Sequence, residues 1–368
     1  MRRLLLFNCS NDLALAQGTK EYIAPKSVVR MERDLCALPW WWAAEGDAVL
    51  LTEGTDKDLI ENFYARYNKN ILFINEEEGY ETLHKKSGAD FRPTPWGWSK
   101  ATAARLQRFG VPASLMPDNK ALDTMRALSS REFAAEYIKE FLSHKAAVPH
   151  HHILVGEKMR FIKRLEELIM PERTIFKSPW SSSGRGVFAA DSIDEPSIRE
   201  KLAGFISRQG GFLADKMYNK QQDFALEYFI SDSGEAQFLG FSLFTAGGNG
   251  YYGYNFVASQ NELRAKITKA GLSDTLIEKL IEIHSALLSQ SLSGKYCGIV
   301  GIDMLTAIDD DTLKIHPCIE INLRMNIGVL AMKVFERTGG IDTQLIPTHN
   351  NIFCAEVKEK KLLIIPRQ

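Results

Sequence analysis

The sequence predicts an α/β fold in its first third and an α+β arrangement in its C-terminal part. In the first third, short runs of strand-forming residues at 4–7, 48–52 and 71–75 alternate with helical stretches such as 56–67. Such alternation is typical of a mostly parallel sheet. Further on, strand-like segments follow one another across short connections, at 211–230 and at 298–326.

The length and composition are those of an ordinary globular protein with more than one packed unit. The chain has 368 residues, of which 45% are hydrophobic and 25% are charged. Its formal net charge of −1 gives no strong attraction to nucleic acid or to anionic membranes. We therefore expect neither as a partner, and any anionic ligand must be held by a local group of donors.

The cysteines and the N-terminus bear on the compartment. Five scattered cysteines without a CxxC pair predict neither a disulfide framework nor a structural zinc site. They fit a reducing environment, so we expect a cytoplasmic location. The four apolar residues after Arg2 and Arg3 are too few for the apolar region of a signal peptide, and no transmembrane span is expected.

The loop after the first strand, NCSNDLALAQG at 8–18, lies where parallel sheets place ligands, at the carboxyl end of a strand. Asn8, Asn11 and Asp12 are therefore candidate substrate contacts, although the same residue types also shape turns and cap helices. Trp40–Trp42 and the tryptophans near 96 are further candidates, with burial in a core as the alternative. Both alternatives stay open.

Polar stretches indicate a boundary near residue 118. Residues 92–100, RPTPWGWSK, are dense in Pro, Gly and Trp and are expected to be irregular, and MPDN follows at 116–119. An amphipathic helix is predicted over 129–145, capped by Ser129 or Ser130. The three histidines that follow, His150–His152, alternate faces in an extended chain, which argues against one shared metal ion. We expect domains at 1–118, 119–213 and 214–368.

The stretch TIFKSPWSSSGRGVF at 174–188 reads as a strand, a lysine and a loop of small residues. Lys177 projects from the strand, and Ser181–Gly186 offer hydroxyls, backbone N–H groups and two glycines. Such a loop can fold over phosphates, with the lysine as a compact positive charge. The alternative is a serine-rich hairpin turn.

Two further segments have the character of a nucleotide pocket. At 211–230 one strand ends at Asp215–Met217, and the next carries Asp223 and Glu227 on one face by period-two alternation. Backbone groups at such a crossing can pair with an adenine edge, and an acidic residue beyond it can accept hydrogen bonds from ribose hydroxyls. The Gly/Asn/Tyr-rich segment 243–255 is interpreted either as a mobile loop that shapes a pocket or as an irregular surface loop, with Gly247–Tyr254 as candidate substrate contacts.

The segment 298–326 is the most specific. It reads as two strands joined by a turn at 309–311, which places Asp303 roughly opposite Glu320. Glu320 and Asn322 share a face because they are two residues apart, and Arg324 follows. Carboxylate and amide oxygens of this kind suit Mg²⁺, which bridges to substrate phosphates. A surface carboxylate pair neutralised by Arg324 is the alternative.

In this order, the stretches FKSPWSSSGRGV, ADKMYNKQQDF, GIVGIDM and IEINLR resemble the ATP-grasp superfamily. The resemblance covers roughly residues 120 to 330 and implies a two-subdomain ATP-grasp fold with antiparallel sheets. The first third is then similar to the α/β domain that precedes this fold, the pre-ATP-grasp domain. A small subdomain at 119–213 would carry the lid loop, and a large one at 214–368 the magnesium site.

The resemblance also implies roles for single residues. Lys177 matches the strand lysine at the α-phosphate and adenine N7. Arg131 is the best match to the second lysine of the family, and Arg324 matches the arginine beside the transferred phosphate, so Lys177 and Arg324 carry catalysis. Asp223 matches the ribose-binding acid. The remaining matches are the lid (Ser181, Ser182, Ser183, Gly184, Arg185, Gly186), the adenine-reading hinge (Asp215, Lys216, Met217) and the Mg²⁺ ligands (Asp303, Glu320, Asn322).

The implied reaction is ATP-dependent ligation. ATP converts a small-molecule or peptide carboxylate to an acyl phosphate, and an amine or other nucleophile then displaces phosphate. ATP and Mg²⁺, with Mn²⁺ as a substitute, are the implied cofactors, and a homodimer is a possible assembly. The alternatives are a small-molecule kinase and a nucleotide-binding module without turnover.

Overall fold

The computed structural model of the chain describes residues 1–181, 184, 186–245, 253–347 and 351–366. The chain divides into two compact units. Unit 1 comprises Met1–Asp123, Gly250–Ser259 and Val329–Gln368, and unit 2 comprises Thr124–Asn249 and Gln260–Gly328. The units are therefore assembled from discontinuous segments, whereas the predicted division at residues 118 and 213 follows chain order and remains a prediction.

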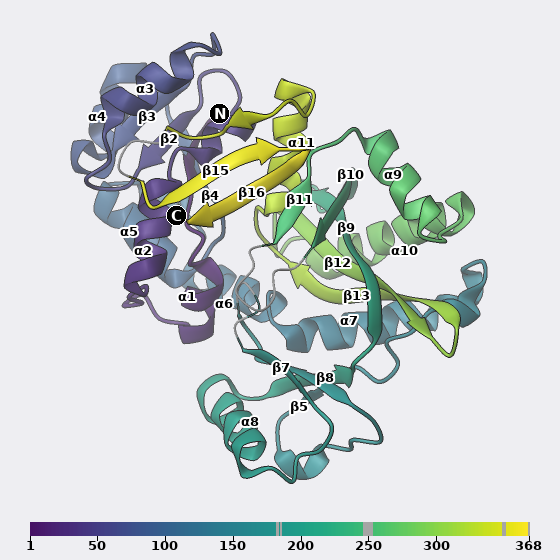
Figure 1. The fold of residues 1–368 in the computed structure, drawn as a ribbon. Coiled ribbons are helices and arrows are strands. Elements are labelled where there is room, and N and C mark those ends of the chain that lie inside the picture. Colours follow the sequence, from purple (N-terminus) through teal and green to yellow (C-terminus); the bar gives the residue numbers. More distant parts are fainter. Residues whose placement is uncertain (182–183, 185, 246–252, 348–350, 367–368) are drawn as a thin grey trace. The chain divides into compact units, whose positions relative to one another are not determined.

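The first 123 residues of unit 1 contain a four-stranded parallel sheet in the order β3-β2-β1-β4 (Figure 1). This confirms the predicted mostly parallel sheet. Helices connect successive strands because apolar strand residues alternate with amphipathic stretches. The strands are β1 (Arg2–Leu6), β2 (Ala48–Leu51), β3 (Leu72–Asn75) and β4 (Phe91–Pro95), and the helices are α1 (Asn11–Gln17), α2 (Lys26–Asp34), α3 (Lys57–Ala65), α4 (Gly79–Ser87) and α5 (Lys100–Phe109).

The prediction that residues 92–100 are irregular is wrong for the first part of this stretch, because β4 pairs with β1 over its whole length. Its prolines are compatible with an edge strand. The N–H of Trp96 donates to Leu6 O at 2.7 Å. Pro93 and Pro95 occupy the alternate positions, whose N–H groups would point away from β1, so the ladder loses no donor.

The C-terminal residues add antiparallel strands to unit 1. They are β14 (Thr343–Gln344), β15 (Phe353–Lys358) and β16 (Lys361–Pro366), and β16 also pairs with β11 (Tyr254–Phe256). The yellow arrows of β15 and β16 run side by side in opposite directions in Figure 1. Leu345 O accepts the indole N–H of Trp41 at 2.8 Å and the hydroxyl of Tyr64 at 2.6 Å, which ties this segment to the first 123 residues.

Unit 2 contains two sheets. The smaller has the order β5-β8-β6-β7, and α8 (Pro196–Gln209) covers one of its faces (Figure 1). It is formed by β5 (Arg160–Ile162), β6 (Thr174–Lys177), β7 (Val187–Ala190) and β8 (Phe212–Lys216). The loop 178–186 therefore joins the antiparallel strands β6 and β7, which both the phosphate-loop interpretation and the hairpin alternative for 174–188 allow.

The other sheet segment in unit 2 has the order β13-β12-β9-β10, and all its pairings are antiparallel. Its strands are β9 (Asn219–Ile230), β10 (Ala236–Thr245), β12 (Gly298–Asp309) and β13 (Thr312–Asn322). The helices of unit 2 are α7 (Arg131–Ser143), α9 (Gln260–Lys269) and α10 (Asp274–Leu292), whereas α6 (Asn119–Leu128) begins in unit 1 and most of α11 (Ile327–Thr338) belongs to unit 1. Asp310 and Asp311 form the β12–β13 turn with φ of 48° and 54°, a left-handed conformation that Asp tolerates. Among the described residues, no helix has the length and apolar character that crossing a membrane requires.

Candidate functional site

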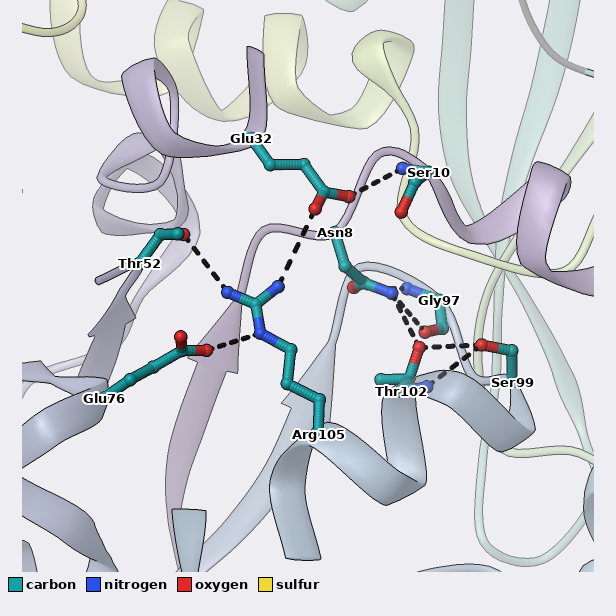
Figure 2. Close-up of polar contacts among 9 residues, drawn as sticks. All are labelled: Asn8, Ser10, Glu32, Thr52, Glu76, Gly97, Ser99, Thr102 and Arg105. Carbon is teal, nitrogen blue, oxygen red and sulfur yellow. Dashed lines mark hydrogen bonds and ion pairs between the residues drawn. The ribbon is translucent and has the colours of Figure 1, made fainter. Parts of the chain in front are cut away.

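The loop after β1 is held by contacts within unit 1 (Figure 2). The side-chain amide of buried Asn8 donates to Gly97 O at 2.8 Å and to Thr102 Oγ1 at 3.0 Å, and Gly97 N–H donates to Asn8 Oδ1 at 3.3 Å. Asn11 is also buried, and a Cβ on Gly97 would lie 2.4 Å from its side-chain amide. These contacts join the loops after β1 and β4 and favour the structural interpretation of both asparagines; Asp12 lies in the first turn of α1.

Arg105 of α5 links the carboxyl ends of the other strands (Figure 2). Its guanidinium contacts Glu76 after β3, donates to Thr52 Oγ1 after β2 at 3.1 Å, and lies 3.8 Å from Glu32 of α2. Glu32 also accepts the backbone N–H of Ser10 at 2.8 Å. The carboxyl edge of this sheet is thus occupied by a network of mutually bonded polar groups.

The tryptophan run belongs to the core of unit 1. Trp40 and Trp41 are 1% and 0% exposed. The Trp40 ring stacks on Tyr64 with centroids 4.7 Å apart. Trp96 is buried as well, with its ring 5.1 Å from Phe7. This burial favours the core interpretation over substrate stacking for these three tryptophans.

The residues predicted to bind metal lie on one face of the sheet in unit 2. Asp303 pairs with Glu320, and Gly301 pairs with both Asn322 of β13 and Glu227 of β9. Paired residues on neighbouring strands share a face, as do residues two apart on one strand. Glu227, Asp303, Glu320 and Asn322 therefore project from the same face, and the predicted pairing of Asp303 with Glu320 is confirmed.

Arg131 connects this face to the lid. It is the first residue of α7, and its side chain is 5% exposed. Nη1 donates to Ser178 O at 2.6 Å and to Ser181 Oγ at 2.7 Å, and Nη2 donates to both carboxylate oxygens of Glu320 at 2.8 and 2.9 Å. One guanidinium thus fixes the start of the lid loop against a predicted metal ligand.

Lys177 ends β6 and is buried at 8% exposure. Burial lowers its pKa, and so does the neighbouring charge of Arg131, whereas Glu320, Asp215 and Asp303 act in the opposite direction. The ammonium group therefore lies within electrostatic reach of both predicted carboxylate ligands.

The two facing carboxyl groups have pKa values that shift in opposite directions. The pKa of Asp303 is raised well above its usual range by burial and by the charges of Glu320 and Glu227. Burial would also raise the pKa of Glu320, but the charges of Arg131 and Lys177 lower it. Glu320 is thus held ionised, and Asp303 is the carboxyl group that lacks sufficient positive charge.

Arg324 lies at the end of β13. Its Nη2 donates to Asn322 Oδ1 at 2.8 Å and its Nη1 to Met325 O at 3.3 Å. Its charge lowers the pKa of both Asp303 and Glu320 without cancelling the burial effect on Asp303. Glu320 forms its ion pair with Arg131. The alternative considered from the sequence, a surface carboxylate pair neutralised by Arg324, would have placed Arg324 in this role.

The predicted hinge follows β8. Asp215 is buried, and its Oδ2 lies 3.0 Å from Nε2 of His316 on β13. The side chain of Lys216 turns to Asp309 at 2.7 Å and Glu172 at 3.2 Å. Met217 donates its N–H to Arg173 O at 2.9 Å. The hinge is therefore fixed to both sheets of unit 2 by the side chains of Asp215 and Lys216, whereas the side chain of Met217 is exposed.

The remaining predicted residues are near this group. Asp223 is buried on β9 and accepts a hydrogen bond from Lys220 at 2.6 Å. In the lid, Gly186 has φ of 72°, and a Cβ there would lie 2.4 Å from Ser178 Oγ, so only glycine fits this turn. Gly184 also has φ of 72°. Ser182, Ser183, Arg185 and 246–252, which include most of the candidate contacts Gly247–Tyr254, lie outside the described residues.

The fold of the chain is similar to that of solved structures with very different sequences. A biotin carboxylase–β,γ-ATP complex from Campylobacter jejuni matches with a TM-score of 0.50 and 14% identity over 97% of this chain and 75% of that chain. Pyruvate carboxylase from Rhizobium etli matches with a TM-score of 0.52 and 13% identity over 90% of this chain. The chain has the ATP-grasp fold.

The similarity to these solved structures is one of fold. The match covers only 27% of the length of the pyruvate carboxylase. No protein-family model matches the sequence, and no curated protein matches it. Because the identities are only 13% and 14%, the two matches show the fold of the chain alone.

The donor set in this ATP-grasp fold fits a hard divalent cation. Asp303, Glu320 and Asn322 present oxygen ligands on one sheet face, and the raised pKa of Asp303 indicates an excess of negative charge there. Each bonded oxygen of Glu320 and Asn322 retains a second lone pair. Among the residues that the structure describes, no group of three His, Cys, Asp or Glu side chains is suited to a metal ion.

Two contacts of unit 2, and the burial of Glu227, were not predicted from the sequence. The partner of Arg131 on the loop is a backbone group, Ser178 O, which has no sequence signature. His316 lies on the predicted strand but pairs with Asp215 101 residues away. Glu227 shares the period-two face of Asp223, and this alternation was the available signal for its position.

Proposed function

We propose that the protein is an ATP-dependent ligase that activates a carboxylate as an acyl phosphate and joins it to an amine or another nucleophile, releasing ADP and phosphate. The observation that carries this proposal is the convergence of Lys177, Arg131 and Glu320 with Asp303 in one unit. The biotin carboxylase with the same fold was solved with a β,γ-ATP ligand, which supports nucleotide chemistry.

Phosphoryl transfer demands positioning and charge neutralisation more than covalent help from the protein. Lys177 and Arg131 supply two buried positive charges beside the predicted phosphate position. Asp303, Glu320 and Asn322 would hold Mg²⁺, which would offset the phosphate charge. Arg324, fixed by Asn322, faces the charge that develops on the acyl phosphate.

The loop between β6 and β7 would close over ATP. Its two ends are anchored, because Ser178 N–H donates to Gly186 O at 2.9 Å and Arg131 binds Ser181. Anchored ends and glycines in between permit a hinged movement that excludes water from a hydrolysable acyl phosphate.

Hydroxylamine trapping tests the proposal. Purified protein is incubated with MgATP, a pool of small carboxylates and dipeptides, and hydroxylamine, and both ADP and hydroxamate are measured. We expect hydroxamate in proportion to ADP, with little of either after Asp303→Ala or Glu320→Ala. Glu336→Ala, at an exposed glutamate paired with Lys333, is the matched control.

The other outcomes separate the alternatives. A stable phosphoester with ADP and no hydroxamate would identify a kinase. MgATP binding without ADP formation would identify a binding module. Unchanged MgATP binding and turnover in both alanine variants would show that the metal site is elsewhere.

A further inference from the structure

Glu227 is a buried carboxylate next to the predicted catalytic face that no step above uses. It lies on β9 and pairs with Gly301, which pairs on its other side with Asn322. Its side chain therefore points to the same side of the sheet as Asp303 and Asn322, one strand further from β13.

The partners of Glu227 are neutral. Ser242 Oγ donates to Oε1 at 2.7 Å, and Asn326 Nδ2 donates to Oε2 at 2.7 Å. Glu227 is 1% exposed, and none of the ion pairs among the described residues involves it. Arg324 and Asp303 are the charged groups close enough to affect it, with opposite signs.

A buried carboxylate with two neutral donors lacks positive charge. Burial raises the pKa of Glu227, and the hydrogen bonds from Asn326 and Ser242 offset this only in part. A carboxylate has about four acceptor positions, of which these donors occupy two. A cationic donor that bound there would form a charge-assisted hydrogen bond with a carboxylate that is already buried from solvent.

Two glycines hold the carboxylate against the backbone. A Cβ on Gly301 would lie 2.8 Å from Oε2, and a Cβ on Gly328 would lie 2.6 Å from Oε1. Neither glycine has a positive φ, so the backbone conformation does not require glycine at these two positions. The lack of a side chain instead allows the carboxylate to approach the backbone closely. The strand and the start of α11 thus lie close against the carboxylate, and a side chain at either glycine would displace it.

We propose that Glu227, with Ser242 and Asn326, binds the ammonium group of the nucleophile that attacks the acyl phosphate. The nucleophile is accordingly an amino acid or the ammonium ion. The inference rests on the proposed function and adds the class of its second substrate. A neutral alcohol or thiol would bring no positive charge to this carboxylate and is disfavoured.

The site also supplies the proton acceptor for the coupling step. The bound ammonium transfers one proton to the Glu227 carboxylate, and the freed nitrogen lone pair attacks the carbonyl carbon. The C–N bond forms and the bond from that carbon to the phosphate oxygen breaks. The departing phosphate takes the electron pair and, with it, the second proton from nitrogen.

The test compares a charged and an uncharged nucleophile. Hydroxylamine is uncharged at neutral pH and needs no carboxylate to hold or deprotonate it. Each protein is given MgATP and the carboxylate pool with hydroxylamine, or with a mixture of the twenty common amino acids and ammonium chloride. Hydroxamate and amide are quantified by mass spectrometry.

We expect Glu227→Gln to form hydroxamate within about threefold of the wild type and to lose amide formation about 100-fold or more. Gly328→Ala should show the same selective loss, because its Cβ would displace Oε1. Glu235→Gln, at an exposed glutamate of unit 2, should behave like the wild type in both reactions. Hydroxamate formation by each variant also shows that it is folded.

The outcomes distinguish the two levels of the proposal. Hydroxamate without amide from the wild type overturns the role of Glu227 and leaves the ligase proposal standing. Equal loss of hydroxamate and amide in Glu227→Gln, or loss of neither, overturns it as well. Absence of hydroxamate with every carboxylate overturns the proposed function and this inference together.

Discussion

Arg131 and Glu320 are joined by two hydrogen bonds, from one guanidinium nitrogen to both carboxylate oxygens, at 2.8 and 2.9 Å. The two residues are 189 positions apart and come from a helix start and a strand. The same arginine holds the first residue of the lid. In the proposed function, this one side chain would couple nucleotide binding, the position of the lid and metal ligation.

Loss of the arginine charge should weaken both folding and nucleotide binding. Arg131→Met leaves Glu320 without its main partner, and the removal of one member of a buried ion pair costs about 3 kcal/mol or more. We expect that loss in the free energy of unfolding measured with urea, together with weaker MgATP binding by calorimetry. Arg164→Met, at an exposed ion pair with Glu167, should leave both unchanged. Equal stability of Arg131→Met and the wild type would argue against the coupling.

Asp303→Asn should stabilise the metal-free protein at neutral pH while abolishing activity. The folded pKa of Asp303 lies above its unfolded value because of burial and nearby carboxylates, so ionisation of this group lowers stability. That penalty grows as pH rises from the unfolded pKa to the folded pKa and is complete above the latter. In the absence of Mg²⁺, the melting temperature of the variant should exceed that of the wild type at pH 8, with the difference shrinking as pH falls towards 4.

The same variant should lose its ATP turnover about 100-fold or more in the presence of Mg²⁺, as expected for a missing metal ligand. Glu336→Gln is the control for the general effect of removing a negative charge. A lower melting temperature for Asp303→Asn at pH 8 would show that the carboxylate is compensated within the protein itself.

His284 should make the protein sensitive to mild acid. It is fully buried on α10, with Nδ1 3.0 Å from the hydroxyl of Tyr137, and burial lowers its pKa to about 3. A lowered folded pKa means that protons bind the unfolded chain more strongly, so stability falls as pH decreases below about 6.5 at up to about 1.4 kcal/mol per pH unit. His284→Leu should flatten urea-unfolding stability between pH 6.5 and 5, whereas exposed His144→Leu should not. An unchanged slope in His284→Leu would assign the acid sensitivity to other groups.

Asn8→Ala distinguishes a structural asparagine from a substrate contact. Gly97 O and Thr102 would lose their buried partner, at a cost of about 1–3 kcal/mol in unfolding free energy. MgATP binding should not change, because the predicted nucleotide residues lie in unit 2. Asn62→Ala, at an exposed position of α3, is the control. A variant with full stability and impaired coupling would instead make Asn8 a substrate contact.

The sequence was most informative where local periodicity decides the structure. Asp303 and Glu320 could be placed roughly opposite each other because a short acidic turn joins their two strands. A bulge between Asp303 and Leu305, which the sequence did not indicate, shifts the register by two residues and brings the two carboxyl groups into direct pairing. The parallel sheet was predictable for a similar reason, since strands and helices alternate along the chain. β4 was missed because Pro93 and Pro95 normally interrupt strands, and only their edge position makes them harmless.

Contacts between residues far apart in the sequence could not be predicted from local patterns. The pairing of Arg131 with Glu320 joins residues in separate elements, and nothing in either local pattern selects the other. The burial of Glu227 depends on Ser242, Asn326 and two glycines from different elements, so the sequence showed its face but not its isolation from solvent. The placement of 329–368 with the first 123 residues likewise depends on contacts such as Trp41 to Leu345.

This discontinuous make-up of unit 1 sets an order of events during synthesis. Unit 2 has all its residues once Gly328 has left the ribosome, so its hairpin and both its sheets can form at that point. Unit 1 is synthesised earlier, but at that point it still lacks β14, β15 and β16. The indole N–H of Trp41 can bond to Leu345 O only after residue 345 has been synthesised. A nascent chain halted at residue 328 should therefore be able to bind nucleotide while the indole N–H of Trp41 still lacks its native acceptor, Leu345 O.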